Sequence, residues 1–425
     1  MHILCIGLCM WISVLCGETD FFVGGQRELR ETDAIAITEE AEKGEEGEDR
    51  EEEMQYGEEA PENEMTPYEV QEELLSCYDF TELDKVMQEM GGVEAITFEE
   101  LVQELMTGDI KTEASETEKW KQEIYQVFLS ELNANRGIMI KLIVLAMITA
   151  LYSNMSGPKV QGMVSENGFY VTYLIMTALF VSSYSLIYQV AWQTIEDILG
   201  IMQTLIPTYM MAVGMSSGVA SSVILQSGLV FGITTVSWSI EKVVFPVIQL
   251  FVVIGLVNNL LERDHFSKLA ELMQTLVNWM LKSVLAVVVG VNTIKSMMAP
   301  ATDSVTTTAL QRGLTVIPGG QAITAVSGVV IGSGVLIKNA IGMGGIIILA
   351  LTVSVPVIKM TVFILLYKML AAILQPIADP RMIRGLNSIS QGGQLLISAV
   401  LSVIVLFMVS IAVIAVSTNV AYYAG

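Results

Sequence analysis

The stretch LLISAVLSVIVLFMVSIAVIAV, residues 395–416, contains no charged side chain. As a helix with a rise of 1.5 Å per residue it is about 30 Å long, which matches the hydrocarbon core of a bilayer. Inside that core every backbone N–H and C=O has to be paired within the protein, and a helix achieves this within one segment. The stretch therefore predicts a transmembrane helix.

Similar apolar segments precede this one through the C-terminal two thirds of the chain, separated by short polar interruptions. We predict an all-α, polytopic membrane domain over residues 137–425 with about eight to ten segments, because most have the ~20 residues that one crossing needs. Whether the shorter run 316–326 is re-entrant or interfacial is left open. The predicted segments are 138–152, 169–190, 198–215, 219–239, 243–261, 276–294, 328–355, 357–377 and 395–416.

Charge is divided unevenly along the chain. Residues 1–136 carry 36 acidic and 9 basic side chains, a net charge of −27, whereas residues 137–425 carry 9 acidic and 13 basic ones, a net charge of +4. The sequence thus joins an acidic polar region to a membrane domain that is nearly free of charge. Its acidity argues against nucleic-acid binding, which needs a basic face.

Residues 1–17 contain an apolar run that is too short to span a bilayer comfortably. Its length is that of a signal peptide with cleavage near Cys16 and Gly17, and its lack of a basic start leaves an uncleaved signal anchor as the alternative. Either form exports the region that follows. Residues 18–67 are acidic and of low complexity, and we predict a disordered, self-repelling linker.

Residues 68–136 show the pattern of short amphipathic helices. Thr97 and Glu100 have the spacing of a helix capping box, as do Asp79 and Glu82. No cluster of metal ligands or acid/base pair is visible, and we interpret Cys77 as a small buried hydrophobe. The region is therefore predicted to be a small exported helical region that docks rather than catalyses.

Two parts of the membrane domain resemble each other, with the matching motifs in the same order and at a nearly constant spacing along the chain. We predict repeats of about residues 198–298 and 309–418, in parallel or inverted orientation. Transporter-like and pore-like membrane folds often contain such repeats, with the functional site at their interface. The matches are Ile-Pro at 206–207 and 317–318, Ser-Gly-Val at 217–219 and 327–329, Pro-Val-Ile at 246–248 and 356–358, and Val-Leu at 284–285 and 400–401.

Glycines at four-residue spacing predict close packing between helices in the membrane. Pro246 and Pro356 each predict the start of a helix after a break, because proline has no N–H and is tolerated in a first turn. Gln375-Pro376 predicts a kink or a stop. The packing candidates are Gly214, Gly218, Gly228, Gly232, Gly328 and Gly332.

Lysines in apolar surroundings are the most informative polar residues of the membrane domain. Lys338 lies well inside its apolar segment, and no acidic residue occurs between Asp303 and Asp379. A charge at the middle of a bilayer costs roughly 2.5–3.5 kcal/mol on insertion scales. Lys338 and Lys359 therefore either extend to the membrane surface or face a water-filled cavity.

The sequence contains neither the H-E-x-x-H pattern of zinc hydrolases nor the G-x-x-x-x-G-K-[ST] phosphate loop. Gly214, Ser216 and Gly218 spell the hydrolase nucleophile elbow, but that motif needs a strand–turn–helix setting and a histidine partner. We predict no enzymatic activity, no cofactor and no metal site. If the protein works in an energy-driven process, another polypeptide supplies the ATPase.

Several short motifs and the order of the regions resemble a known family. The motifs are SGVLIKN at 333–339, Gly345, Pro356, Lys359, Tyr367-Lys368 and AAILQP at 371–376, together with FEEL at 98–101 in the exported region. The chain is similar in these residues to stage III sporulation protein AE of endospore-forming bacteria, over about residues 100–425 and most strongly from Pro318 to Pro376.

The resemblance implies a non-enzymatic membrane subunit of the sporulation channel complex that links the mother cell and the engulfed forespore. It implies residence in the mother-cell-derived membrane around the forespore, with the N-terminal region between the two membranes, and a need for the protein in late forespore gene expression. The implied partners are the other stage III sporulation A-operon proteins, among them a cytosolic ATPase and small membrane subunits, and stage II sporulation protein Q. Lys338, Asn339, Pro356, Lys359 and Gln375 become candidates for a pore or for structure.

Two other functions are weighed against this one. A stand-alone secondary transporter built on the repeat would use the same architecture, but the paired membrane acids of many cation-coupled carriers are missing. An intramembrane enzyme would need ligands and bases that the sequence lacks. Arg381 and Arg384 favour a cytoplasmic location for their loop, and Glu196-Asp197 is expected on the opposite side.

Overall fold

A computed structural model describes residues 67–89, 97–108, 114–155, 163–260, 266–315 and 320–424, and these residues contain helices and no strand. The predicted all-α fold class is confirmed for this part of the chain. The predicted signal segment lies outside the described residues, and so does the acidic linker except for Pro67.

Three short helices come first: α2 (Pro67–Ser76), α3 (Thr81–Glu89) and α4 (Phe98–Thr107). The capping box predicted at Thr97 is present, because Thr97 Oγ1 accepts from the N–H of Glu100 and the Glu100 carboxylate accepts from the N–H of Thr97. Asp79 instead accepts from the N–H of Thr81, and α3 begins there. Cys77 is exposed, so its interpretation as a buried hydrophobe was wrong.

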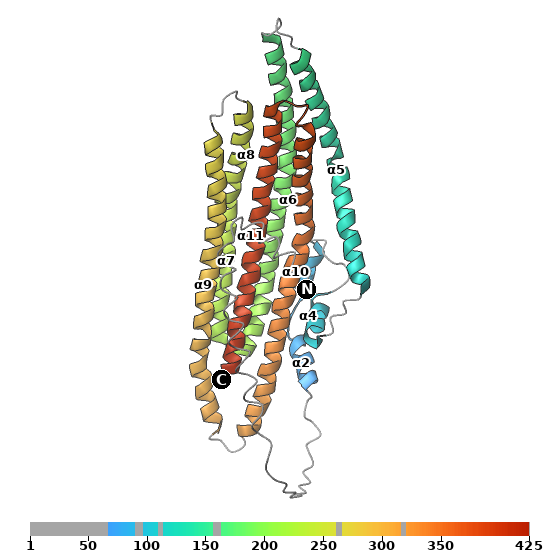
Figure 1. The fold of residues 1–425 in the computed structure, drawn as a ribbon. Helices are drawn as coiled ribbons and strands as arrows, with labels where there is room; N and C mark the ends of the chain where they lie inside the picture. The colour runs from blue at the N-terminus through green and yellow to red at the C-terminus, as the bar shows by residue number, and fades with distance from the viewer. Residues whose placement is uncertain are drawn as a thin grey trace, which may run out of the picture. The chain divides into compact units, whose positions relative to one another are not determined.

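Long helices make up the rest of the chain and run side by side (Figure 1). Five helical stretches of the described residues are long and apolar enough to cross a membrane: Val171–Ser217, Val219–Asn259, Ser267–Ala299, Val330–Leu374 and Pro380–Asn419. The protein is thus built as a multi-pass membrane protein. The helices of this part are α5 (Ala114–Met155), α6 (Met163–Ser217), α7 (Val219–Ser239), α8 (Phe245–Leu260), α9 (Ser267–Thr315), α10 (Gly320–Leu374) and α11 (Pro380–Ala424). A short π-helix, η1 (Ile240–Val244), joins α7 to α8.

Several helices are longer than the apolar segments predicted from the sequence, whereas α7 coincides with the predicted segment 219–239. The predicted segments 169–190 and 198–215 form one helix, α6, and 328–355 and 357–377 lie largely within α10. The interruption at Glu196 and Asp197 does not end α6, because acidic residues are compatible with a helix and these two lie on its exposed or half-buried side. Glu196-Asp197 is therefore part of a helix, and its location on the side opposite Arg381 and Arg384 stays a prediction.

Proline acts differently at its two predicted helix starts. Pro246 is the second residue of α8, but the preceding turn is the π-helix η1, so that α7, η1 and α8 follow each other without a loop. Pro356 lies in the interior of α10, and the break predicted there does not exist. α10 ends at Leu374, so the stop predicted at Gln375-Pro376 is confirmed.

A single residue, Gly218, connects α6 to α7. Its φ of 112° and ψ of 152° belong to a region of backbone space that is open essentially only to glycine. Gly214 faces Ser222 across the turn, since a Cβ on Gly214 would lie 3.3 Å from Ser222 Oγ. The predicted packing pair Gly214 and Gly218 thus makes a tight hairpin, in which one glycine permits the turn and the other permits the close approach.

α11 packs against α6, α8, α9 and α10 and is half buried along its apolar window, more than any other candidate span. The continuous stretch α7–η1–α8 forms one helical hairpin with α9. α10 and α11 form a second one. Asn259 Nδ2 at the end of α8 donates to Ser388 Oγ near the start of α11 over 3.1 Å, so the two hairpins turn at the same end of the bundle. They therefore run parallel, although duplication itself stays a prediction.

Candidate functional site

Lys338 lies inside the bundle, with 0% of its surface exposed. α10 carries it to the side of α11, where its Nζ donates to Thr418 Oγ1 over 2.8 Å and to Asn419 Oδ1 over 2.6 Å. The Thr418 hydroxyl can donate in turn to the carbonyl of Ile414 over 2.7 Å. The ammonium thus ends on polar groups of a neighbouring helix and does not extend to the outside of the bundle.

The charge of Lys338 is held by neutral oxygens. None of its hydrogen bonds within the described residues goes to a carboxylate. Thr418 and Asn419 lie near the C-terminal end of α11, where the helix dipole favours a cation. Hydrogen bonds to a buried charge are worth more than neutral ones, about 1.5–3 kcal/mol each. The arrangement joins α10 to the last turns of α11.

The other sequence-predicted candidates are spread along α10 and do not form one site. Asn339 is half-buried, and its Oδ1 has no hydrogen-bond partner among the described residues. Pro356 and Lys359, both half-buried, lie about five to six turns beyond Lys338. Gln375 is exposed and follows the end of the helix. Lys338 and Asn339 are neighbours only in the sequence, and consecutive residues of a helix do not face each other.

Of the predicted packing glycines, Gly228 and Gly232 lie at a contact between α7 and α9. Gly228 of α7 is close to α9, where a Cβ on it would lie 2.6 Å from Asn292 Oδ1 and 3.1 Å from Lys295 Cδ. Gly232 lies against Val288 in the same way, at 2.9 Å. Gly332 is half-buried in α10, and the surroundings of Gly328 lie outside the described side chains.

Two polar contacts between α9 and its neighbours were not predicted from the sequence. Lys295 Nζ donates to Ser227 Oγ of α7 over 2.7 Å, and Asn292 Nδ2 donates to Ser410 Oγ of α11 over 2.9 Å. Asn292 is buried, and its Oδ1 has no hydrogen-bond partner in the described part of the chain. At the offset of 110 residues that relates the flanking repeat motifs, Lys338 corresponds to Gly228, so the predicted repeat gives no signal for the contact of Lys295.

The N-terminal helices pack against α6 and α10 through aromatic side chains. Phe98 is fully buried, and a Cβ on Gly344 of α10 would lie 3.2 Å from its ring. The ring of Phe80 contacts that of Phe98, with centroids 5.3 Å apart. Tyr78 Oη donates to Met215 Sδ of α6 over 3.0 Å, and burial raises the pKa of Tyr78 to about 12. The predicted docking region thus docks on its own membrane domain.

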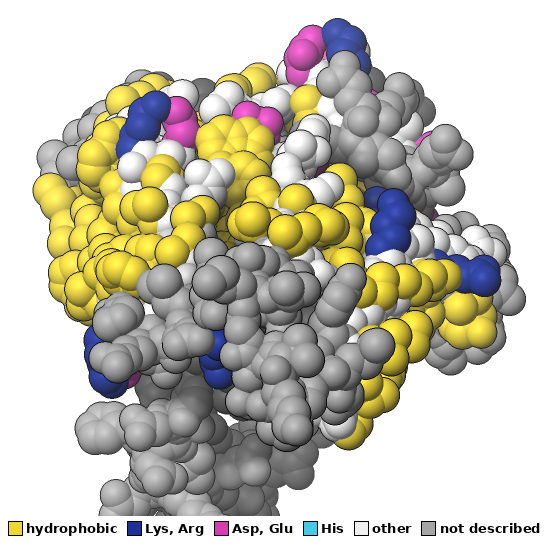
Figure 2. Space-filling view, turned by 90° about the horizontal axis from the view of Figure 1, so that it is seen from above, with side chains coloured by type: hydrophobic (Ala, Val, Ile, Leu, Met, Phe, Trp, Pro, Cys, Tyr) yellow, Lys and Arg dark blue, Asp and Glu magenta, His cyan; other side chains and the backbone are white. Residues whose placement is uncertain are grey.

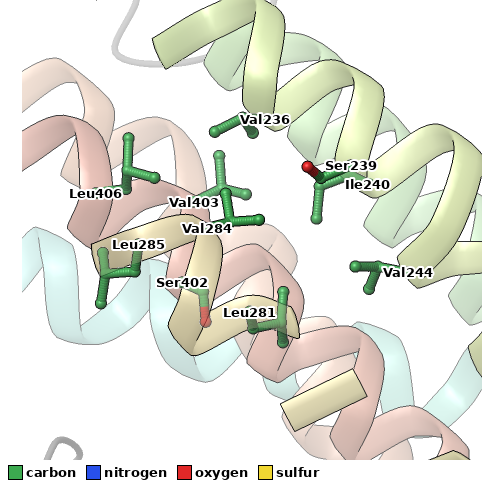
Figure 3. A pocket seen from close by; sticks show the side chains of 10 residues that line it. All are labelled: Val236, Ser239, Ile240, Val244, Leu281, Val284, Leu285, Ser402, Val403 and Leu406. Carbon is green, nitrogen blue, oxygen red and sulfur yellow. The ribbon is translucent and has the colours of Figure 1, made fainter. Parts of the chain in front are cut away.

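A small cavity lies apart from the Lys338 site and from the contacts of the N-terminal helices (Figure 3). It is bounded by α7, η1, α9 and α11, and its walls are apolar except for two serines. Because no titratable side chain lines it, it offers no acid, base or charged anchor. Its lining residues are Val236, Ser239, Ile240, Val244, Leu281, Val284, Leu285, Ser402, Val403 and Leu406. No three His, Cys, Asp or Glu side chains in the described ranges come together as metal ligands.

Comparison with known proteins finds a match to the family model of stage III sporulation protein AE over residues 96–418, which include every helix from α4 to α11 in whole or in part. The chain belongs to this family. It is 25% identical over 336 residues to stage III sporulation protein AE of Bacillus subtilis (strain 168), covering 79% of this chain and 84% of that protein. No solved structure matches significantly.

The family match confirms the resemblance described from the sequence and identifies the chain as a sporulation protein with a multi-pass membrane domain. It begins at residue 96, just before the capping box of α4. α4 therefore belongs to the family region together with the helices on which it packs, whereas α2 and α3 precede it.

Proposed function

We propose that this chain is a non-enzymatic membrane subunit of the sporulation complex that connects mother cell and forespore, and that it contributes to a pore. Membership of the stage III sporulation protein AE family carries the proposal. It is supported by the burial of Lys338 and Asn292 between apolar helices. Asn292 Oδ1 has no hydrogen-bond partner among the described residues. Polar and ionisable groups in such positions commonly mark pathways through membrane proteins.

The partners we propose are the other stage III sporulation A-operon proteins, including a cytosolic ATPase and small membrane subunits, and stage II sporulation protein Q from the forespore side. The sequence offers no phosphate loop of its own, so a driven process would take its energy from that ATPase. The complex would support late gene expression in the forespore.

We propose residence in the mother-cell-derived membrane, with α2–α4 in the space between the two membranes. α2–α4 pack near the end of the bundle at which α6 turns into α7, whereas Arg381 and Arg384 lie at the start of α11, at the opposite end. An excess of Lys and Arg marks the cytoplasmic side of membrane proteins. The charges therefore favour an N-terminal region on the side away from the mother-cell cytoplasm.

The test is deletion of the gene in its spore-forming host, followed by complementation with the native chain. We expect few heat-resistant spores and weak activity of a late forespore reporter after deletion, and recovery of both on complementation. Normal spore formation in the deletion strain would contradict the proposal.

A stand-alone secondary transporter is the second candidate, because the two helical hairpins run parallel, as repeats of transporters can. The purified chain reconstituted alone in liposomes separates the two functions. Solute uptake by the chain alone would favour the transporter, whereas uptake or leakage that appears only with the partner proteins would favour the complex.

A further inference from the structure

The helical stretch formed by α7, η1 and α8 changes its hydrogen bonding at one place. In η1 the N–H of Phe245 donates to the carbonyl of Ile240, five residues earlier, whereas an α-helix uses the carbonyl four residues earlier. From Val219 to Leu260 the backbone is otherwise α-helical. Single π-turns of this kind are rare in proteins and are frequent at functional sites. The position of η1 therefore needs a physical cause.

Pro246, the second residue of α8, supplies part of that cause. In an α-helix the N–H of residue 246 would bond to the carbonyl of Lys242, but proline has no N–H and its ring would clash with that carbonyl. The wider π-turn relieves this clash. Proline does not impose the turn by itself, because α6 and α10 continue as α-helices through Pro207 and Pro356. The surroundings of η1 must therefore contribute.

Unfilled space borders η1 (Figure 3). Ile240 and Val244 of η1 form part of the wall of the small cavity, and Ser402, Val403 and Leu406 of α11 lie across it. Protein interiors are packed to the density of organic crystals, and voids between their side chains are few. The turn that departs from α-helical hydrogen bonding is therefore also a turn with room beside it.

The outer side of η1 is polar. Glu241 and Lys242 are exposed and form an ion pair. Charged side chains are otherwise sparse among hydrophobic ones on the described surface, as Figure 2 shows for one end of the molecule. A helical turn that bends leaves backbone carbonyls without their usual donors, and these carbonyls need another donor. Lys242 places such a donor in the turn itself.

α8 is anchored on α6 and α11. The ring of Phe245 contacts those of Tyr188 and Trp192 of α6, with centroids 5.2 and 5.4 Å apart. Gly255 lies close to α11, where a Cβ on it would be 2.9 Å from Ser388 Oγ. The part of the stretch that follows η1 is therefore held by these two neighbours.

α7 is anchored on α9. Its glycines Gly228 and Gly232 approach α9 closely, and Ser221 Oγ donates to the carbonyl of Ala299 over 2.7 Å. α7 also packs on α6, to which Gly218 connects it. With 21 residues it spans about 32 Å between two irregular points of the backbone, Gly218 and η1. The two parts of the stretch thus have different anchors on α9 and α11.

We propose that η1 is a hinge at which α7 changes its angle to α8, and that the cavity provides the space for this movement. α7 would pivot at Gly218 and η1 and would carry its contact with α9 against α11. Hinges are commonly a few residues at the ends of helices that absorb the change of backbone angles. The hinge describes how the bundle moves, and it applies to the complex subunit and to the transporter alike.

Distances between two spin labels test the hinge in the full chain reconstituted in liposomes. With the native cysteines changed to serine, the labels are attached to Val223→Cys on α7 and Val253→Cys on α8, which are exposed positions. A straight helix would separate them by about 45 Å, a distance that pulsed electron paramagnetic resonance measures. Labels at Met343→Cys and Leu365→Cys of α10 are the matched control, because they flank a proline without a π-turn.

We expect a distance distribution at least twofold broader across η1 than across Pro356. Pro246→Ala restores the missing N–H and should narrow the distribution across η1 to the width of the control. Val403→Leu adds a methylene group to the wall of the cavity and should narrow it as well, with Pro246 in place.

Equal widths across η1 and across α10 in the native chain would overturn the proposal. A distribution across η1 that stays broad in a folded Pro246→Ala variant would overturn it too. If Pro246→Ala does not fold, Val403→Leu decides, because an unchanged width in that variant shows that the cavity does not serve the movement.

Discussion

Lys338 and Thr418 are far apart in the sequence, and yet the Nζ of one donates to the Oγ1 of the other over 2.8 Å inside the bundle. This bond and the one to Asn419 join the two helices of the second hairpin close to the C-terminus of the chain. Among the described residues no carboxylate bonds to Lys338, and its charge depends on such neutral acceptors because burial removes the water that would otherwise solvate it.

We therefore expect Asn419→Leu to lower the stability of the purified protein by about 1.5–3 kcal/mol, the value of a hydrogen bond to a buried charge. The double variant Lys338→Met/Asn419→Leu should be more stable than Asn419→Leu, because it leaves no buried cation without its acceptor. Thermal unfolding in detergent measures both. A double variant that is less stable than the single one would show that Lys338 has other, stronger interactions.

The docking of α4 should depend on the fit between Phe98 and Gly344. Phe98→Ala removes a fully buried ring, a change that costs about 3–5 kcal/mol in a packed core. Gly344→Val places side-chain atoms where the ring now lies, since even a Cβ would be 3.2 Å from it. Both variants should speed hydrogen exchange in α4.

Gly290→Val on α9 is the matched control for this effect, because a Cβ there meets nothing within 4 Å. It should leave exchange in α4 unchanged. If α4 exchanges at the native rate in both Phe98→Ala and Gly344→Val, the helix is not held by this contact.

The hairpin at Gly218 predicts a strong preference for glycine. Gly218→Ala should lower stability by about 1–3 kcal/mol, the usual cost of placing a non-glycine residue in this region of backbone space. Gly137→Ala in α5 is the comparison, because that glycine is helical with open space around it, and alanine should raise stability there by about 0.5–1 kcal/mol. Equal effects at the two positions in thermal unfolding would contradict the role of the turn.

The contact of Tyr78 should weaken at high pH. Burial, and to a smaller extent the nearby Cys77, raise the pKa of Tyr78 from 10.0 to about 12. A group with a raised pKa in the folded state stabilises that state fully below its unfolded pKa and loses this effect as the pH rises through its folded pKa. The contribution of Tyr78 should thus be complete below about pH 10 and disappear as the pH rises past about 12.

Tyr78→Phe cannot ionise and should show a smaller decline of the unfolding temperature between about pH 10 and pH 12 than the native chain. Other buried tyrosines are common to both proteins and cancel in the difference. Parallel declines would indicate that the phenol of Tyr78 stays accessible to water in the folded protein.

The apolar segments predicted the fold class because lipid leaves few alternatives to a helix. They did not predict helix boundaries, since hydropathy falls at Glu196-Asp197 and at Pro356 while the backbone continues as a helix. Lys338 stood out because a charge within an apolar run is rare. Its partners Thr418 and Asn419 did not, because hydroxyl and amide side chains are common in membrane helices and the pairing depends on how two hairpins pack.

The central position of α11 has a consequence for how the chain matures. Translation proceeds from the N-terminus, and domains generally fold in that order during synthesis. Here α11, which packs against α6, α8, α9 and α10, is made after all four of them. The earlier helices must therefore leave room for α11, and their packing is completed only after α11 has been synthesised.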